Sequence, residues 1–364
     1  MSTTAASNNN EPPRTNNEHP HSLSPSFSWL PNDTVLNILA RVPRRNHPIL
    51  CRVSKNFQSI VRSSALHQTR SLMGKDYLYV CFRDFGSPSL AYHWFTLDEN
   101  RLVPIPLSSP PQPNSTALMV GHEIYFVGGY INNHSCKSMW ILNYVSCKLR
   151  QGPSTRVARR RAAVGHVDKK IYVFGRFDHK DKDIQAEVFD TKTQTWDVAP
   201  NPNMDVQCIW MSMVNQSLDR KIYARNYKHV VAYDPRDGKC DKIYLPNNDR
   251  SCSDDVCMID NLLYIHCSYV GLIWYDSKEK EWSVVKGLKL DVYSASEVKM
   301  AEHNGKLVFL WTRSCQEDTK WEIWCAMIAL DRSGVEVMGK VEWFDHVLTV
   351  PCDYKIMHCL GRTD

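Results

Sequence analysis

The chain has 364 residues, and its 44 basic and 39 acidic side chains leave a net charge of only +5. This length allows one large domain together with a small one, and so small a charge argues against a nucleic-acid-binding protein. No stretch approaches the roughly 18 consecutive apolar residues of a membrane-spanning helix, so we expect no association with a membrane.

The first 26 residues are rich in Ser, Thr, Asn and Pro and contain no apolar run. Such a composition predicts that residues 1–26 form a disordered tail and not a signal peptide. The thirteen cysteines include no Cys-x-x-Cys pair of the kind that binds zinc. Since no secretory signal precedes them, we expect all thirteen to be reduced and the protein to be cytoplasmic, nuclear or both.

Residues 30–66 predict a compact set of short helices. Asn32 or Asp33 can cap the first helix with a side-chain oxygen, and Pro43 ends it because proline lacks an amide hydrogen. A second helix is expected over residues 49–61, where apolar side chains recur at helical spacing. The segment is too short to bury a good core alone. It is therefore either a cap packed on the following domain or a docking face for another protein.

Four groups of residues in this segment carry one continuous motif: Leu30-Pro31-x-Asp33, Ile38-Leu39-Ala40-Arg41-Val42-Pro43, Leu50, and Val53-Ser54-Lys55-x-Phe57. The motif resembles the F-box of plant F-box/kelch-repeat proteins, with Phe57 where many F-boxes outside plants carry tryptophan. The resemblance assigns residues 27–72 to an F-box helical domain. It implies that an apolar face binds a Skp-family adaptor of a cullin-RING ubiquitin ligase. The positions that match the family's docking residues are Leu30, Pro31, Ile38, Leu39, Val42 and Val53.

From Tyr77 onward, short apolar runs repeat every 41 to 51 residues, and each is typical of a β-strand. The runs are Leu78-Tyr79-Val80, Ile124-Tyr125-Phe126, Ile171-Tyr172-Val173, Ile222-Tyr223-Ala224, Leu263-Tyr264-Ile265 and Leu307-Val308-Phe309. Three positions before the last five runs stand residues that suit a tight hairpin turn. These turn residues are Gly121, Asp168, Asp219, Asp260 and Asn304.

A second hairpin is expected downstream in each repeat. Phe189 and Trp196, Tyr233 and Cys240, and Tyr275 and Trp282 are each seven positions apart and flank a polar turn. Each repeat thus supplies about four strands, which is typical of a propeller blade, whereas a β-sandwich has no fixed repeat. We expect the tryptophans to pack between blades.

The repeats resemble kelch repeats, although the family's diglycine is intact only at Gly128-Gly129. The predicted fold is therefore mainly β: a six-bladed kelch-type β-propeller over residues 73–364, preceded by the small all-α F-box. The first repeat appears without an inner strand, because Met73-Gly74-Lys75 precedes it directly. We predict that the apolar run over residues 354–360 completes this blade and closes the ring.

No catalytic constellation is present in the sequence: there is no glycine-rich phosphate loop, no His-Glu-x-x-His and no Gly-x-Ser-x-Gly. We therefore expect no enzymatic activity, no metal and no cofactor. The predicted function is a substrate-recognition adaptor of an SCF-type ubiquitin ligase, with the propeller binding an unidentified target protein. Two alternatives are a propeller scaffold that acts without a ligase and a metalloenzyme resembling galactose oxidase.

A basic run lies between the second and third repeats, and it consists of Arg156, Arg159, Arg160 and Arg161. In a propeller, this segment is expected to connect the outer strand of one blade to the inner strand of the next blade, near the central channel. One hypothesis is that these arginines recognise a carboxylate or phosphate on the target, which their fork of donors suits. The other is structural, because an arginine at such a junction can donate hydrogen bonds to carbonyl groups of the neighbouring blade.

Overall fold

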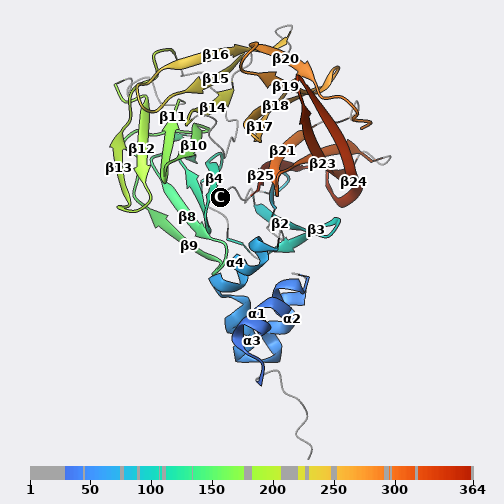
Figure 1. The fold of residues 1–364 in the computed structure, drawn as a ribbon. Coiled ribbons are helices and arrows are strands. Elements are labelled where there is room, and N and C mark those ends of the chain that lie inside the picture. The colour runs from blue at the N-terminus through green and yellow to red at the C-terminus, as the bar shows by residue number, and fades with distance from the viewer. Residues whose placement is uncertain are drawn as a thin grey trace, which may run out of the picture.

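The fold is a ring of β-sheets, called the wheel here, formed by described residues from 78 to 361 (Figure 1). A small helical domain, called the stem, is formed by described residues from 29 to 73. The predicted tail, residues 1–26, lies outside the residues described by this computed structural model. The described residues are 29–43, 46–73, 78–87, 91–105, 107–108, 112–132, 134–175, 183–205, 220–225, 229–246, 252–290, 295, 297–315 and 319–361.

The stem contains four short helices in the described part of the chain: α1 (Asn32–Arg41), α2 (His47–Val53), α3 (Lys55–Val61) and α4 (Ser64–Leu72). The predicted N-cap of α1 is wrong. Pro31 occupies the capping position in an extended conformation, no side chain caps the helix, and Asn32 and Asp33 lie in its first turn. The ring of Pro31 fixes φ near the helical value, so the chain enters the helix directly behind it.

The single helix expected over residues 49–61 is also wrong, because Ser54 divides it into α2 and α3. Ser54 is extended, with φ −157° and ψ 156°, and its hydroxyl oxygen accepts a hydrogen bond of 3.1 Å from the amide of Phe57. Serine side chains compete with helix backbone in this way, and they favour the capping position over the helix interior.

The four helices enclose a small apolar core. Its buried members are Val35, Leu39, Ala40, Val61 and Leu66. The buried guanidinium group of Arg70 in α4 donates to the carbonyl oxygens of Ala40 and Val42, at 2.8 and 2.9 Å. These are carbonyls at the end of α1 that have no partner inside the helix, so Arg70 fastens α4 to α1.

Six antiparallel sheets form the blades of the wheel, and each is written here from its inner to its outer strand. The first three blades are β25 (Tyr354–Leu360), β1 (Tyr79–Asp84), β2 (Tyr92–Asp98) and β3 (Arg101–Ile105); β4 (Thr116–Val120), β5 (Glu123–Val127), β8 (Met139–Asn143) and β9 (Lys148–Gly152); and β10 (Ala163–Val167), β11 (Lys170–Phe174), β12 (Ala186–Asp190) and β13 (Thr195–Val198). A two-stranded hairpin, β6 (Tyr130–Ile131) and β7 (His134–Ser135), extends from the second blade.

The fourth blade has three strands among the described residues, because residues 206–219, where the fourth strand of this repeat is expected, lie outside them. The remaining blades are β14 (Ile222–Arg225), β15 (His229–Tyr233) and β16 (Cys240–Tyr244); β17 (Cys252–Ile259), β18 (Leu262–Cys267), β19 (Gly271–Asp276) and β20 (Glu281–Val284); and β21 (Val298–His303), β22 (Lys306–Ser314), β23 (Lys320–Ser333) and β24 (Glu336–Pro351).

The C-terminal closure of the ring is confirmed. Strand β25 pairs antiparallel with β1, from Tyr79 opposite Leu360 to Asp84 opposite Tyr354. The first blade is thus built from both ends of the propeller segment, and β25 covers the edge that β1 would otherwise expose.

The expected turn conformations and hairpin registers are confirmed wherever they can be seen. Gly121, Asp168, Asp260 and Asn304 all have positive φ, between 48° and 58°, whereas Asp219 lies outside the described residues. The three pairs seven positions apart lie directly opposite each other on neighbouring strands. Spacing along the chain therefore predicted contacts between strands.

Apolar clusters fill the spaces between successive blades, and each combines residues of two neighbouring blades. Trp196 packs in the cluster between the second and third blades and donates its indole N–H to the carbonyl of Pro153 at 2.8 Å. Trp282 packs between the fourth and fifth blades and donates to the carbonyl of Tyr244 at 2.7 Å. Both tryptophans therefore have the predicted structural role.

The intact diglycine allows two chain segments to approach closely. Gly128 has φ +68°, and a Cβ there would collide with the carbonyl oxygen of Arg159. The amide of Gly129 donates to that same carbonyl at 2.9 Å. The diglycine of the second blade thus packs on the segment that leads into the third blade.

Replacing Gly128 with alanine is expected to lower the free energy of unfolding by about 2–4 kcal/mol, because the left-handed φ and the clash both add cost. Gly334→Ala is the matched control, since Gly334 has φ +64° with no atom within 4 Å of an added Cβ. Chemical denaturation of both variants measures the difference. Equal losses would contradict a role for the close approach.

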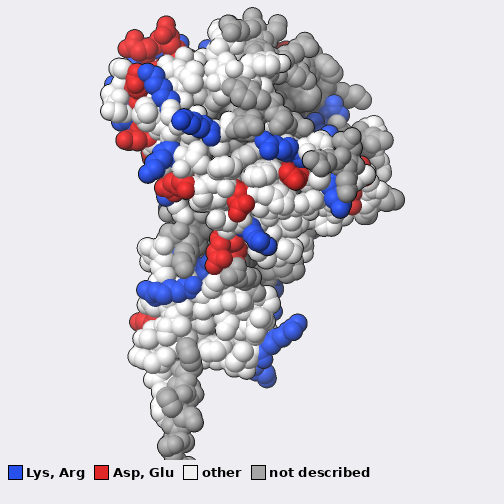
Figure 2. Space-filling view, turned by 90° about the vertical axis from the view of Figure 1, so that its right-hand side faces the viewer, with Lys and Arg blue, Asp and Glu red and all other residues white. Residues whose placement is uncertain are grey.

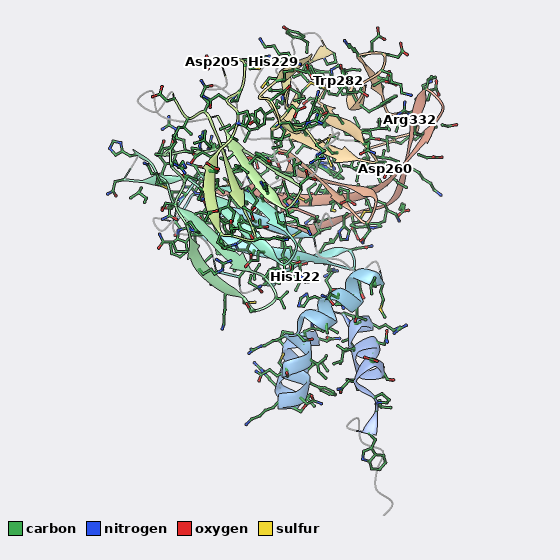
Figure 3. The ribbon with its side chains drawn as sticks, turned by 60° about the vertical axis from the view of Figure 1, so that its left-hand side comes forward. His122, Asp205, His229, Asp260, Trp282 and Arg332 are labelled. Atoms are coloured by element: carbon green, nitrogen blue, oxygen red, sulfur yellow. A yellow bond between two sulfur atoms is a disulfide. The ribbon has the colours of Figure 1, made fainter. Side chains whose placement is uncertain are left out.

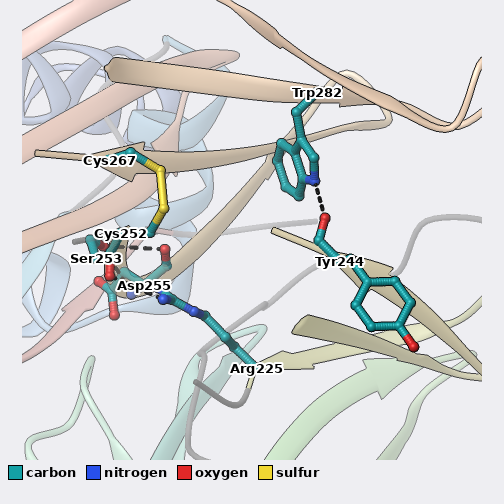
Figure 4. Close-up of a disulfide and its surroundings, with 7 residues drawn as sticks. All are labelled: Arg225, Tyr244, Cys252, Ser253, Asp255, Cys267 and Trp282. Atoms are coloured by element: carbon teal, nitrogen blue, oxygen red, sulfur yellow. Dashed lines mark hydrogen bonds between the residues drawn. A yellow bond between two sulfur atoms is a disulfide. The ribbon is translucent and has the colours of Figure 1, made fainter. Parts of the chain in front are cut away.

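One expectation about the cysteines is wrong. Cys252 and Cys267 lie directly opposite each other on β17 and β18 and form a disulfide (Figure 4). The two residues are separated by 15 positions, and strand register brings their sulfur atoms together. The expectation that all thirteen cysteines are reduced rested on the cellular compartment, which does not indicate which cysteines lie opposite each other on neighbouring strands.

The stem meets the wheel at the turn between β4 and β5. The ring of His67 in α4 lies 6.5 Å from that of His122 and 6.2 Å from that of Tyr144. The hydroxyl of Tyr144 donates to the carbonyl of Gly121 at 2.8 Å, which holds the turn in place. Figure 3 shows His122 at this junction.

Candidate functional site

The predicted adaptor-binding residues fall into two groups in the structure. Leu30, Ile38 and Val53 are exposed, with 39%, 37% and 62% of their surface accessible, and Pro31 is exposed beside them in the chain. These apolar side chains are not covered by the described part of the propeller. A soluble domain of this size seldom leaves such residues open without a partner.

Leu39 and Val42 belong to the other group. Leu39 is buried in the helical core, and Val42 is half-buried beside the end of α1. Leu39 therefore stabilises the helices and contributes little to an outer surface. Sequence matching could not separate the two groups, because both follow the same helical periodicity.

Two exposed apolar side chains were missed by the motif comparison. Trp29 and Ile49 have 60% and 63% of their surface accessible. Ile49 is one of the apolar positions of the helix expected over residues 49–61, and its periodicity does not show whether it is buried or exposed. Figure 2 shows an uncharged area in the middle of the visible face of the stem, with basic side chains at its edges.

Arg159, one of the four predicted target-binding arginines, has a structural role. Its side chain is fully buried and forms an ion pair of 3.0 Å with Glu187, which is buried as well. It also donates to the carbonyl oxygens of Gly175, Gln185 and Ile184, at 3.0 to 3.1 Å. The target-recognition hypothesis is therefore wrong for Arg159, because nothing outside the chain can reach this guanidinium group.

The other three arginines lie at the surface or near the channel. Arg156 is exposed and donates weakly, at 3.4 Å, to the carbonyl of Trp196. The guanidinium of Arg160 lies 5.1 Å from the ring centre of Tyr130. Arg161 is half-buried and donates to the side-chain oxygen of Asn114 at 3.2 Å. These three remain candidates for contact with a target.

A central pocket of about 620 Å³ lies where several inner strands begin. Its walls come from the first, fifth and sixth blades and from Arg161, which precedes β10. The described basic side chains in the wall are Arg161, Lys299 and Lys355, against the single carboxylate of Glu297. The pocket is therefore electropositive, which sequence inspection did not predict beyond Arg161.

His266 contributes a buried imidazole to the same pocket. Burial lowers the pKa of His266 to about 4, so the ring is neutral at physiological pH. Its Nε2 atom has no hydrogen-bond partner in the structure, although the side chain is only 2% exposed. A buried, unpartnered ring nitrogen facing a pocket is available to a ligand.

The described residues include no group of three or more His, Cys, Asp or Glu side chains placed to hold a metal ion. Within the same described part of the chain, none of the helices has both the length and the apolar character needed to cross a membrane.

Comparison with known proteins gives two matches within the chain. Residues 27–69 match the F-box domain, and residues 91–348 match the FKB95, Kelch-repeats domain. The putative F-box/kelch-repeat protein At4g02310 of Arabidopsis thaliana is 51% identical over 358 residues, which cover 95% of this chain and 98% of the relative. The F-box/kelch-repeat protein At2g44630 of the same plant is 41% identical over 374 residues, covering 98% and 99%. The order of domains, the closed six-bladed wheel and these full-length similarities establish that the chain belongs to the plant F-box/kelch-repeat family.

Proposed function

We propose that the protein is the substrate-recognition subunit of an SCF-type cullin E3 ubiquitin ligase. Residues 27–72 bind a Skp-family adaptor, and the propeller over residues 73–364 binds the target protein. The chain itself makes and breaks no covalent bond. It acts by holding the target near the ligase, which raises the effective concentration of the reacting groups.

The observation that carries this proposal is the open apolar surface of the stem. Ile38 and Val53 are exposed on helices whose core is already filled by other side chains, so packing of that core does not account for their being apolar. Covering them with another protein would remove apolar surface from water, which is the main driving force of association.

The experiment is co-purification of the full chain with a Skp-family adaptor. Ile38→Asp and Val53→Asp are each expected to reduce adaptor recovery by about tenfold or more, since each places a charge in the centre of an apolar contact. The thermal unfolding midpoint should stay unchanged, because both positions are exposed. Leu39→Asp is unsuitable, since it would unfold the helical core.

Val335→Asp is the matched control, because Val335 is equally apolar and 81% exposed but lies in the turn between β23 and β24. It should leave adaptor recovery at the wild-type level. Equal recovery in all variants, or none with the wild type, would overturn the F-box assignment and favour a scaffold that acts without a ligase. Cytoplasmic or nuclear localisation follows from the proposed function and is proposed with it.

A further inference from the structure

Three cationic side chains converge beside the central pocket. Arg83 in β1 and Arg161 both donate to the same atom, the side-chain oxygen of Asn114, at 3.3 and 3.2 Å. Arg83 also lies directly opposite Lys355 in the pairing of β1 with β25. Like charges in that position repel each other, so the arrangement costs free energy as it stands.

No described carboxylate forms an ion pair with any of these three cations. Asn114 is neutral and offers one oxygen to two guanidinium groups. The ring of Phe85 lies 4.5 Å from the guanidinium carbon of Arg83 and 5.8 Å from the ammonium of Lys355, which softens the repulsion without removing charge. Arg83 is only 5% exposed, and its Nε atom has no hydrogen-bond partner.

The other charges around the pocket are already used. Lys299 forms an ion pair of 2.8 Å with Asp255, and the carboxylate of Glu297 accepts a hydrogen bond from the amide of Ile356 at 3.2 Å. Glu297 keeps its negative charge in the pocket wall, but no described carboxylate forms an ion pair with Arg83, Arg161 or Lys355, and these three cations outnumber it. Converging guanidinium groups suit the oxygens of a carboxylate or phosphate, which they bind in pairs of hydrogen bonds.

The pocket has the size of a small-molecule site, since such sites span about 300–1,000 Å³. Its wall adds apolar surface from Phe85, Val298 and Ile356, and it adds the unpartnered imidazole of His266. A ligand could thus place an anionic group at the cations and bury an uncharged body in the remaining space.

We propose that this pocket binds a small organic anion, with its carboxylate or phosphate held by Arg161 and Lys355, which line the pocket, while the buried Arg83 beside them adds positive charge. The proposal does not rest on the adaptor role, because the described residues that line the pocket all belong to the propeller. The stem contacts the opposite end of β4, near His122, so a bound anion would lie away from the helical domain.

Thermal unfolding of the full chain with inorganic phosphate, at constant ionic strength, tests the anion site. Wild-type protein should gain about 2 °C or more, with saturation, because phosphate binds the folded state alone. Arg161→Gln should abolish the gain. Asn114→Asp supplies an internal carboxylate between the two guanidinium groups, and Asp tolerates the φ of +60° at this position. This variant should unfold at a higher temperature than wild type and no longer respond to phosphate.

Arg150→Gln is the matched control, since Arg150 is an exposed arginine that pairs with Glu123 elsewhere on the wheel. It should respond to phosphate like the wild type. The proposal would be overturned if phosphate did not stabilise the wild type. It would also be overturned if phosphate shifted the unfolding temperatures of Arg150→Gln and Arg161→Gln equally.

Phenyl phosphate tests the organic part of the ligand by calorimetric titration. It should bind roughly tenfold more tightly than inorganic phosphate, because its ring leaves water for the apolar wall. Equal affinities would limit the site to the anion and overturn the small-molecule assignment. Tighter binding of an acetylated phosphoserine hexapeptide than of phenyl phosphate would also overturn it, in favour of an anion carried on a polypeptide.

Discussion

Glu187→Ala is expected to lower the free energy of unfolding by about 3–5 kcal/mol, as removal of one partner from a buried ion pair does elsewhere. The carboxylate of Glu187 neutralises Arg159 and also accepts hydrogen bonds from the backbone amides of Arg156 and Val157. The variant would leave a fully buried guanidinium charge and two unpaired amides. Chemical denaturation followed by tryptophan fluorescence measures the change.

Two comparisons make this test specific to the buried pair. Asp168→Asn removes the exposed partner of Arg220, and it should change the free energy of unfolding by less than about 1 kcal/mol. The double variant Arg159→Met/Glu187→Leu should recover only part of the loss, because it leaves no unpaired buried charge but still leaves the backbone partners of both side chains unpaired. A loss below about 1 kcal/mol in Glu187→Ala would contradict the structural role of Arg159.

Removal of β25 by truncation after Asp353 is expected to abolish cooperative unfolding of the propeller. The strand supplies the inner edge of the first blade and buries Ile356, Cys359 and Leu360. Its loss would expose β1 and open the apolar cluster between the first and sixth blades. The combined cost exceeds the roughly 5–15 kcal/mol by which a typical domain is stable.

Truncation after Gly361 is the control, because it removes only the residues that follow the strand. It should yield soluble protein with the wild-type unfolding midpoint. Calorimetry and solubility compare the two truncations. A cooperative transition within a few degrees of wild type in the shorter protein would show that the ring does not depend on β25.

Much of the propeller could be predicted because its determinants are local. A tight hairpin turn needs a residue that tolerates positive φ, and Asp168, Asp260 and Asn304 indicate such turns in the sequence. The seven-residue spacing of Phe189 and Trp196 fixes their pairing across one short turn. The closure by β25 was predictable from counting, since one blade lacked a strand and one apolar run was left over.

The pocket could not be predicted, because its residues meet only through the closed ring. Arg83, Asn114 and Arg161 belong to three successive blades, and Lys355 comes from the far end of the chain. The burial of Arg159 has the same origin: nothing in a run of four arginines indicates which one points inward. The break at Ser54 was missed because apolar periodicity continues through it.

The closure by β25 also sets the order of events during synthesis. A ribosome releases the first blade's three outer strands early, but the strand that completes that blade emerges only after the strands of all the other blades. Until β25 has emerged, β1 presents an unpaired edge, and the helical domain is synthesised long before the ring can close. A message cut short between the codons of β24 and those of β25 therefore yields a formed helical domain joined to a propeller whose first blade has an open edge.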